Sequence, residues 1–338
     1  MKLFEKIFSI SFVLALVLLT GALIVSDVQA KNSRKQITNI VSIHKFKPGA
    51  TDTKSSASNY ISPVVDLFPG QQSKRRPDNT HSYLATEGQL RERLTSKSAI
   101  VMDADSGKVI YAHLPDKPAQ PASTIKIITG LIAIQSLENE DWVSPSRRAV
   151  NMPRSKIYLD RKKSYRANDM INAVLLSSAN DASVALAEKI AGSERVFAKL
   201  MTHKAKAWGA DNTVCKTSTG LTAKGQKSTV RDLAVLFNRA MDNEEFAARI
   251  AKTKIRTGYG KMLKNHNRAL WQIDGAEGGK TGYTRAARQT YVGKFKRGAD
   301  ELTVAVMGSE TMWDDIKQLV EYGFAKKKSM GISTASIY

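Results

Sequence analysis

"SAIVMDADSGKVIYAH", residues 98–113, consists of two apolar segments separated by a short polar turn. The segments "SAIVMD" and "KVIYAH" contain the β-branched and aromatic residues that favour strands. Between them, "ADSG" ends on Gly107, and glycine adopts the backbone angles of tight hairpin turns without strain. The stretch therefore predicts a β-hairpin near the start of the folded part of the chain.

Strand patterns return towards the far end of the chain, and helical patterns fill the region between. Strands are expected at 254–259, 288–296 and 301–308. Apolar residues at helical spacing predict helices at 123–138, 168–177, 181–191, 194–207, 229–241 and 311–324. We expect one α+β domain over 84–325, in which both ends of the domain build a central antiparallel sheet flanked by helices.

The N-terminus has the features of an export signal. Lys2 and Lys6 precede an apolar run at 7–25, and Val28 and Ala30 suit cleavage after residue 30. Residues 1–30 are therefore predicted to be a signal peptide. Because the run approaches the ~20 residues that span a bilayer, an uncleaved membrane anchor is the alternative. Either reading places the rest of the chain in the periplasm or on the extracytoplasmic face of the membrane.

The composition is strongly basic. The 338 residues include 52 Lys and Arg against 31 Asp and Glu, a formal net charge of +21. Residues 31–83 predict a flexible basic linker and residues 326–338 a short basic tail, both suited to contact with a membrane or another anionic part of the cell envelope. The positive charge is dispersed and not interleaved with aromatic residues, so no nucleic-acid partner is expected.

Cysteine and histidine give no sign of a metal or redox centre. Cys215 is the single cysteine, and isolated cysteines are more often packed apolar residues than nucleophiles. The five histidines lack the spacing of metal-ligand motifs. Neither a metal nor a cofactor is expected.

A serine and a lysine lie three residues apart in "QPASTIKIITGL", residues 120–131. Pro121 suits the start of a helix, so Ser123 and Lys126 should project from nearly the same face of the first turns. The apolar residues that follow predict a buried helix, in which the pKa of the lysine should fall and leave an amine base for the serine. Taken alone, the pair favours a capping serine beside a surface lysine, because S-x-x-K is a common pattern.

Two further fragments follow in order along the chain. "SSANDA", residues 177–182, places Ser178 and Asn180 at the junction of two predicted helices. "GGKTGYT", residues 278–284, precedes strand-like sequence. S-x-x-K, S-x-N and K-T-G in this order are the signature of serine acyl-transferases that react with penicillin.

The sequence resembles the D-alanyl-D-alanine carboxypeptidase family of low-molecular-mass penicillin-binding proteins. The resemblance covers roughly residues 84–325 and includes "SGKVIYAHLPDKPAQPASTIKIITG", "SANDASVALAE", "TSTGLT" and "EGGKTGYTRAA". It implies a β-lactamase/transpeptidase-like fold with an all-helical subdomain. The active site is then expected at the edge of the central sheet, beside that subdomain.

The resemblance also implies catalytic roles. Ser123 would be the acylated nucleophile, Lys126 its base, and Ser178 the relay of a proton to the leaving amine. The backbone N–H groups of Ser123 and Tyr283 would form the oxyanion hole, which stabilises tetrahedral charge without a side chain.

Besides Tyr283, four residues are expected to bind substrate. Asn180 would hold the substrate backbone, Lys280 would supply positive charge, and Thr281 would bind the terminal carboxylate. Gly282 would let the substrate lie close to the sheet edge, because a side chain there would block its approach.

The expected function is a serine-type D-Ala-D-Ala carboxypeptidase that trims peptidoglycan stem peptides and is inhibited covalently by β-lactams. An endopeptidase that cleaves peptidoglycan cross-links is the alternative, since the motifs do not separate the two. A β-lactamase is disfavoured, because Asp211 is the only acidic residue between Arg195 and Arg231, where a deacylating glutamate would be sought. A basic binding module without catalysis is disfavoured by the intact motifs.

Overall fold

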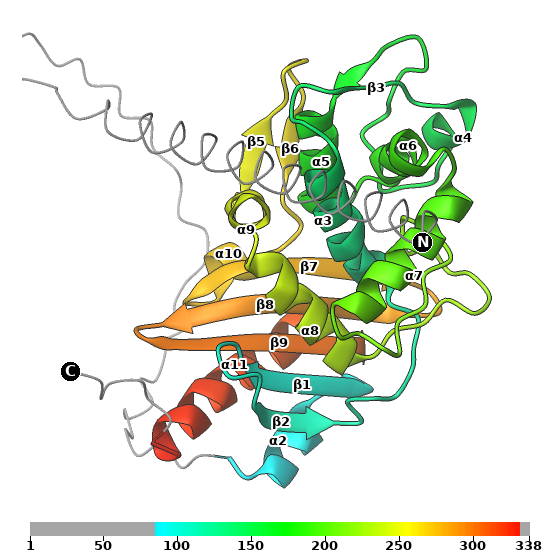
Figure 1. Cartoon of the computed structure of the whole chain (residues 1–338). Coiled ribbons are helices and arrows are strands. Elements are labelled where there is room, and N and C mark those ends of the chain that lie inside the picture. The colour runs from blue at the N-terminus through cyan, green and yellow to red at the C-terminus, as the bar shows by residue number, and fades with distance from the viewer. Residues whose placement is uncertain (1–84, 332–338) are drawn as a thin grey trace, which may run out of the picture. The chain divides into compact units, whose positions relative to one another are not determined.

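The structure is a computed structural model that describes residues 85–331 (Figure 1). At its centre is a five-stranded antiparallel sheet in the order β2-β1-β9-β8-β7. The strands are β1 (Ser98–Asp103), β2 (Val109–His113), β7 (Ala276–Thr284), β8 (Arg288–Arg297) and β9 (Asp300–Ser309). The predicted hairpin is present as β1 and β2, and β1 pairs with β9 from the far end of the domain. The predicted fold class is confirmed.

Helices cover both faces of the sheet because alternate strand residues point to opposite sides. Along β9, Val304 and Val306 pack under α11 (Met312–Ser329) and α2 (Glu87–Arg93), whereas Ala305 faces the core shared with α8 (Val230–Met241). Because both faces are buried, apolar residues follow one another in the centres of β1 and β9 and do not alternate with polar ones.

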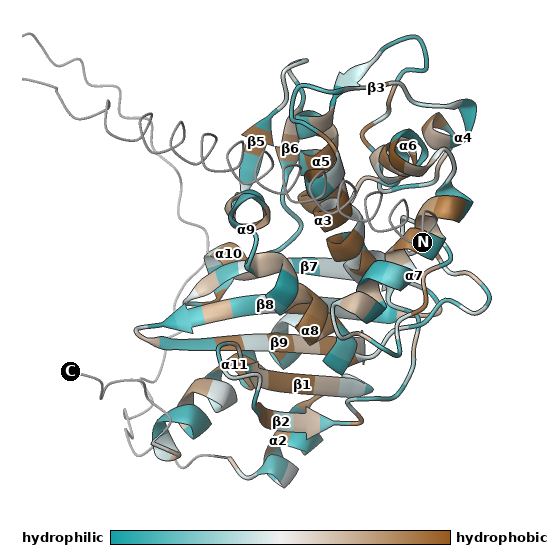
Figure 2. Cartoon of the chain, in the orientation of Figure 1, coloured by the Kyte–Doolittle hydropathy of each residue, from teal (hydrophilic) through white to brown (hydrophobic). Residues whose placement is uncertain are grey.

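A helical part stands beside the edge strand β7 (Figure 1). Its centre is α3 (Lys126–Ser136), whose first eight residues are all buried and which is brown in Figure 2, as expected of a helix enclosed by others. Around it lie α4 (Arg147–Val150), α5 (Ala167–Leu175), α6 (Asn180–Ala191), α7 (Glu194–Ala207) and α9 (Glu244–Ile250). The remaining elements are the 3₁₀ turn η2 (Ala122–Ile125), the short helix α10 (Ala269–Gln272) and two small antiparallel strand pairs. One pair is β3 (Trp142–Val143) with β4 (Tyr165–Arg166), and the other is β5 (Lys254–Arg256) with β6 (Met262–Lys264).

Two expectations about strands were wrong. The strand expected at 254–259 is only the three-residue β5, and it pairs with β6 outside the central sheet. Conversely, 276–284 is itself a strand, although its sequence "AEGGKTGYT" has weak strand character. Pairing with β8 overrides that weak local preference, as tertiary context commonly does in sheets.

The last helix continues to Ser329, past the domain boundary expected at 325. Lys327, which the sequence placed in a basic tail, is buried and forms ion pairs with Asp103 at 2.6 Å and with Asp300 at 3.3 Å. Two acidic partners compensate the buried charge and anchor the end of α11 to the sheet. The predicted signal peptide, the linker and residues 332–338 lie outside the described residues. Within 85–331, no helix combines the length and apolar character needed to cross a membrane.

Candidate active site

Ser123 lies on the short 3₁₀ turn η2, which leads directly into α3. The turn is held at its start, where the carbonyl oxygen of Pro121 accepts a hydrogen bond from Thr290 Oγ1 on β8 at 3.0 Å. Ala122 has a positive φ of 49°, a conformation that is uncommon for residues other than glycine. The sheet and the helical part therefore both contribute to the placement of the serine.

Lys126 is completely buried at the start of α3, and its Nζ lies 2.9 Å from Ser123 Oγ. Nζ also donates to Asn180 Oδ1 at 2.8 Å and to the carbonyl oxygen of Thr219 at 2.6 Å. Burial, reinforced by the charge of Lys280, lowers the pKa of Lys126 well below its usual range. A neutral amine has two N–H donors and one lone pair. In that neutral form, Asn180 and Thr219 take both donors, which leaves the lone pair of Lys126 for Ser123.

Ser178 and Asn180 lie where α5 gives way to α6. Asn180 is held firmly, because its Nδ2 donates to the carbonyl oxygens of Pro153 and Arg154 at 3.1 Å each. These bonds fix the orientation of the amide, so that its Oδ1 faces Lys126. Ser178 has a positive φ of 57° and accepts a hydrogen bond from Lys280 Nζ at 3.0 Å.

The edge strand β7 approaches η2 closely at Gly282. A Cβ there would lie 2.7 Å from the backbone nitrogen of Ser123, so no other residue fits without displacement. This contact places Ser123 beside Tyr283, the two residues whose N–H groups are the predicted oxyanion hole. The structure thus brings the first motif, S-x-x-K, and the last motif, K-T-G, into contact.

A cleft of about 830 Å³ joins these groups, within the range of small-molecule sites. It is lined by Ser123, Ser178, Asn180, Thr281, Gly282 and Tyr283, with Lys126 and Lys280 buried behind them. Of the eight predicted site residues, all therefore lie in or directly behind one cleft. None of the residues that line the cleft in the described part of the chain is acidic.

Several residues in or beside the cleft were not predicted. The carbonyl oxygen of Thr219 accepts a hydrogen bond from Lys126, and a backbone atom leaves no side-chain pattern in the sequence. Trp271 and Trp313 also line the cleft. His266 lines it as well, and burial together with Lys280 and Lys126 lowers its pKa to about 4, so it is neutral.

Lys280 gives a testable pH dependence. Burial lowers the pKa of its ammonium to about 7, so it carries a positive charge below that pH and loses it above. We expect the second-order rate constant of acylation by a carboxylate-bearing β-lactam to fall as the pH rises through about 7. The methyl ester of the same β-lactam is the control, and its rate constant should lack this descending limb. An identical limb for acid and ester would show that Lys280 does not recognise the carboxylate.

An antiparallel sheet whose edge strand faces a serine–lysine pair on a helix defines the class of serine hydrolases that react with penicillin. Comparison with known proteins agrees. The chain belongs to the D-alanyl-D-alanine carboxypeptidase family, whose model matches residues 85–311. The predicted family and the serine carboxypeptidase class are thereby confirmed, and the carboxypeptidase prediction is favoured over the endopeptidase alternative.

Individual relatives show how far the similarity extends. The chain is 35% identical over 237 residues to D-alanyl-D-alanine carboxypeptidase DacB2 of Mycobacterium tuberculosis, covering 67% of this chain and 81% of that protein. It is 31% identical to DacF of Bacillus subtilis, covering 68% of this chain but only 62% of the relative, which is less than two thirds of that protein's length. Among solved structures, penicillin-binding protein D2 of Listeria monocytogenes in its ampicillin-bound form is 27% identical with a TM-score of 0.63, covering 68% of this chain and 98% of that one.

Proposed function

We propose that the domain removes the terminal D-alanine of peptidoglycan stem peptides through an acyl-enzyme on Ser123. Lys126 takes the hydroxyl proton as Ser123 Oγ attacks the carbonyl carbon of the penultimate D-alanine. The N–H groups of Ser123 and Tyr283 stabilise the oxyanion. The bond to the terminal D-alanine then breaks, and water hydrolyses the remaining ester. The observation that carries this proposal is the 2.9 Å distance between Lys126 Nζ and Ser123 Oγ.

The other residues of the cleft suit the leaving group. Ser178, which accepts a hydrogen bond from Lys280, passes a proton to the departing amine. Thr281 and the charge of Lys280 bind the carboxylate of the terminal D-alanine. Asn180 holds the backbone of the substrate. A β-lactam carries a comparable amide and carboxylate, and we infer that it acylates Ser123 by the same steps, in keeping with the ampicillin-bound form of the Listeria protein.

An endopeptidase acting on cross-linked peptides remains the second candidate. Trp271 and Trp313 line the same cleft as Thr281 and offer apolar surface for a larger group than a single D-alanine. Digestion of purified pentapeptide and cross-linked muropeptides side by side distinguishes the two. Release of D-alanine without loss of cross-links supports a carboxypeptidase, whereas loss of cross-links supports an endopeptidase.

We propose that the chain is exported and that residues 31–80 keep the domain near the anionic envelope. This stretch holds nine Lys or Arg and three Asp or Glu, a net charge of 9 − 3 = +6. Electrostatic attraction of this kind weakens in salt, because the Debye length shrinks from about 10 Å at 0.1 M to about 3 Å at 1 M.

Removing the linker is therefore expected to weaken binding but not catalysis. A protein starting at Tyr83 should keep full activity on a small soluble peptide and bind isolated cell envelopes less tightly than the mature chain at low salt. The difference should vanish in 1 M salt, near the ~3 Å Debye length. Equal binding of both proteins at low salt would make the linker a spacer, and loss of activity on the soluble peptide would show that the domain begins earlier.

A further inference from the structure

The loop at 217–221 contacts both members of the serine–lysine pair. The carbonyl oxygen of Thr219 accepts a hydrogen bond from Lys126 Nζ at 2.6 Å. Gly220, with a φ of +77°, packs so closely under the turn that carries Ser123 that a Cβ would lie 1.9 Å from the carbonyl oxygen of Ala122. A displacement of this loop would therefore move one of the two acceptors that orient the lone pair of Lys126.

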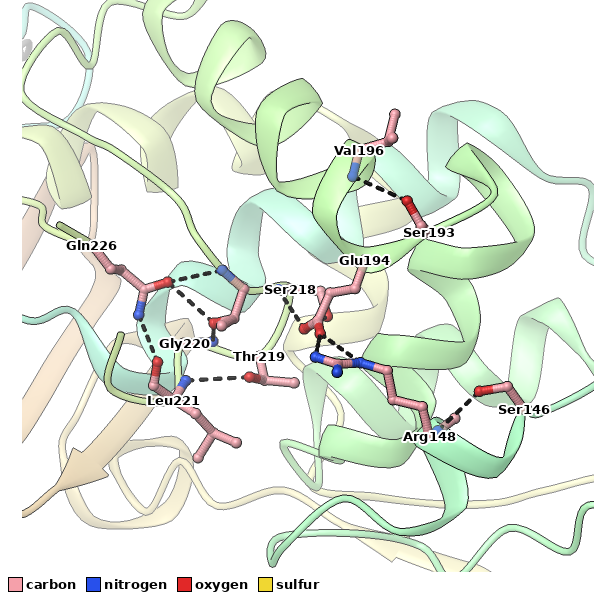
Figure 3. Close-up of polar contacts among 12 residues, drawn as sticks. Ser146, Arg148, Ser193, Glu194, Val196, Ser218, Thr219, Gly220, Leu221 and Gln226 are labelled. Carbon is pink, nitrogen blue, oxygen red and sulfur yellow. Dashed lines mark hydrogen bonds and ion pairs between the residues drawn. The ribbon is translucent and has the colours of Figure 1, made fainter. Parts of the chain in front are cut away.

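A buried carboxylate holds the loop in this place (Figure 3). Glu194, the first residue of α7, is 6% exposed, and its Oε1 accepts hydrogen bonds from the backbone nitrogen of Ser218 at 3.0 Å and from Ser218 Oγ at 2.9 Å. On the opposite side, Thr129 Oγ1 on α3 donates to the carbonyl oxygen of Ser218 at 2.7 Å. Ser218 is thus fixed from two helices, and it directly precedes Thr219.

Arg148 on α4 holds the other oxygen of the carboxylate. Its Nε donates to Glu194 Oε2 at 3.2 Å, and its Nη2 donates to the same oxygen. The two oxygens of Glu194 therefore accept four hydrogen bonds in all, which offsets much of the cost of burying the charge. The side chain of Arg148 is 63% exposed. The Arg148–Glu194 ion pair therefore connects the surface of the helical part with the buried loop at 217–221.

Glu194 has no contact with the space where substrate would bind. It is absent from the lining of the cleft and lies behind the loop as seen from Ser123. It therefore differs from the deacylating glutamate of a β-lactamase, which must reach the acyl-enzyme. Any effect of Glu194 on the reaction has to pass through the loop or through its charge.

We propose that Glu194, anchored by Arg148, is a positioning residue for the catalytic lysine: it fixes Ser218 and thereby sets the Thr219 carbonyl against Lys126 Nζ. This inference rests on the proposed function, because it assumes that Lys126 is the base for Ser123. The purely structural alternative is that Glu194 only stabilises the packing of α7 against the loop.

The pH dependence of acylation separates these two roles. The titratable and charged groups around Lys126 are Lys280 on β7, Asp181 on α6, Glu194 on α7 and His266 after β6. The negative charge of Glu194 raises the pKa of Lys126, against the lowering by burial and Lys280. Loss of that charge lowers the pKa of Lys126 further. Since the base acts when neutral, the ascending acid limb of the rate profile then moves to lower pH.

The test measures the second-order rate constant of acylation of Ser123 by a β-lactam across pH, together with the fraction of protein labelled at completion. Glu194→Gln keeps the shape of the side chain, but its amide N–H groups meet the N–H groups of Arg148 if its oxygen stays with Ser218. We expect the rate constant per labelled site to fall about 10- to 100-fold, the loss typical of a hydrogen bond to a charged group, with the acid limb moved to lower pH.

Glu188→Gln on α6 is the matched control. It removes the same charge near Arg148 without a hydrogen bond to the loop, and we expect the wild-type rate and profile. Arg148→Ala is the second variant, because its own side chain is 63% exposed; thermal unfolding checks that the variant folds with Glu194 unpaired. A fall of about 3- to 10-fold is expected when the carboxylate loses its anchor.

The outcomes divide cleanly. A wild-type rate and profile in folded Glu194→Gln, or a loss explained wholly by fewer labelled molecules, would overturn the positioning role. If Glu194→Gln does not fold, a wild-type rate in Arg148→Ala overturns it instead. Failure of the wild-type protein to label at Ser123 would reject the proposed function, not this inference alone.

Discussion

Replacing Ser123 by alanine is expected to abolish both release of D-alanine and covalent labelling by penicillin. Loss of a nucleophile typically lowers turnover by about 10⁶-fold, because no covalent intermediate can form. The side chain of Ser123 makes a single hydrogen bond within the described residues, to Lys126, so the fold should not depend on it. Intact-protein mass spectrometry after incubation with a β-lactam, and an assay of D-alanine release, measure the two losses.

Thermal unfolding is the control for this variant. The midpoint should remain within a few degrees of the wild type, since a substitution that leaves the packing intact changes stability by roughly 0.5 kcal/mol or less. A stable covalent adduct on the folded alanine variant would show that another residue is the nucleophile.

Lys126→Arg is expected to lose acylation although it keeps a cationic side chain. A guanidinium has a pKa above about 12 and cannot give up its proton to serve as a base. Burial and the charge of Lys280, by contrast, lower the pKa of the lysine well below its usual range, which favours loss of its proton. We expect the rate constant of acylation to fall by about 10²- to 10⁴-fold, the usual contribution of a general base. Stopped-flow or quenched labelling with a chromogenic β-lactam measures it.

Because arginine is larger and the site is closed, Lys126→Met serves as a second variant that fits the apolar surroundings. It should fold, as judged by thermal unfolding, and should also fail to acylate. Near wild-type acylation in either folded variant would mean that Lys126 acts through charge or packing and not as a base.

The side chains of the site were predictable because each belongs to a short motif with its own chemistry. Ser123 and Lys126 share one turn, Ser178 and Asn180 share one helix junction, and the structure brings them together with Thr281 on β7. Their catalytic roles remain predictions. The supporting groups could not be found in this way. Thr219 acts through its carbonyl oxygen. Glu194 contacts the preceding residue, Ser218, which lies more than twenty residues away in the sequence.

The fold was predictable where apolar patterns are strong. The hairpin around Gly107, the helix α7 and the paired strands β8 and β9 all follow from local periodicity. The edge strand β7 was missed because "GGKTG" serves close approach to η2 and carries few residues that favour strands. Short elements such as α4, with four residues, are set by capping at Ser146 and leave almost no periodic signal.

The pairing of β1 with β9 has a consequence for synthesis of the chain. Ser98 on β1 lies opposite Met307 on β9, so the first of the described strands to be synthesised must wait for the last one. Contacts between residues so far apart close large loops and slow folding. Until β9 emerges, the hairpin of β1 and β2 has one edge open and its apolar face uncovered, a state prone to wrong pairing. The domain therefore depends on completed synthesis, and a nascent chain that stops before about residue 300 has no central sheet to fold around.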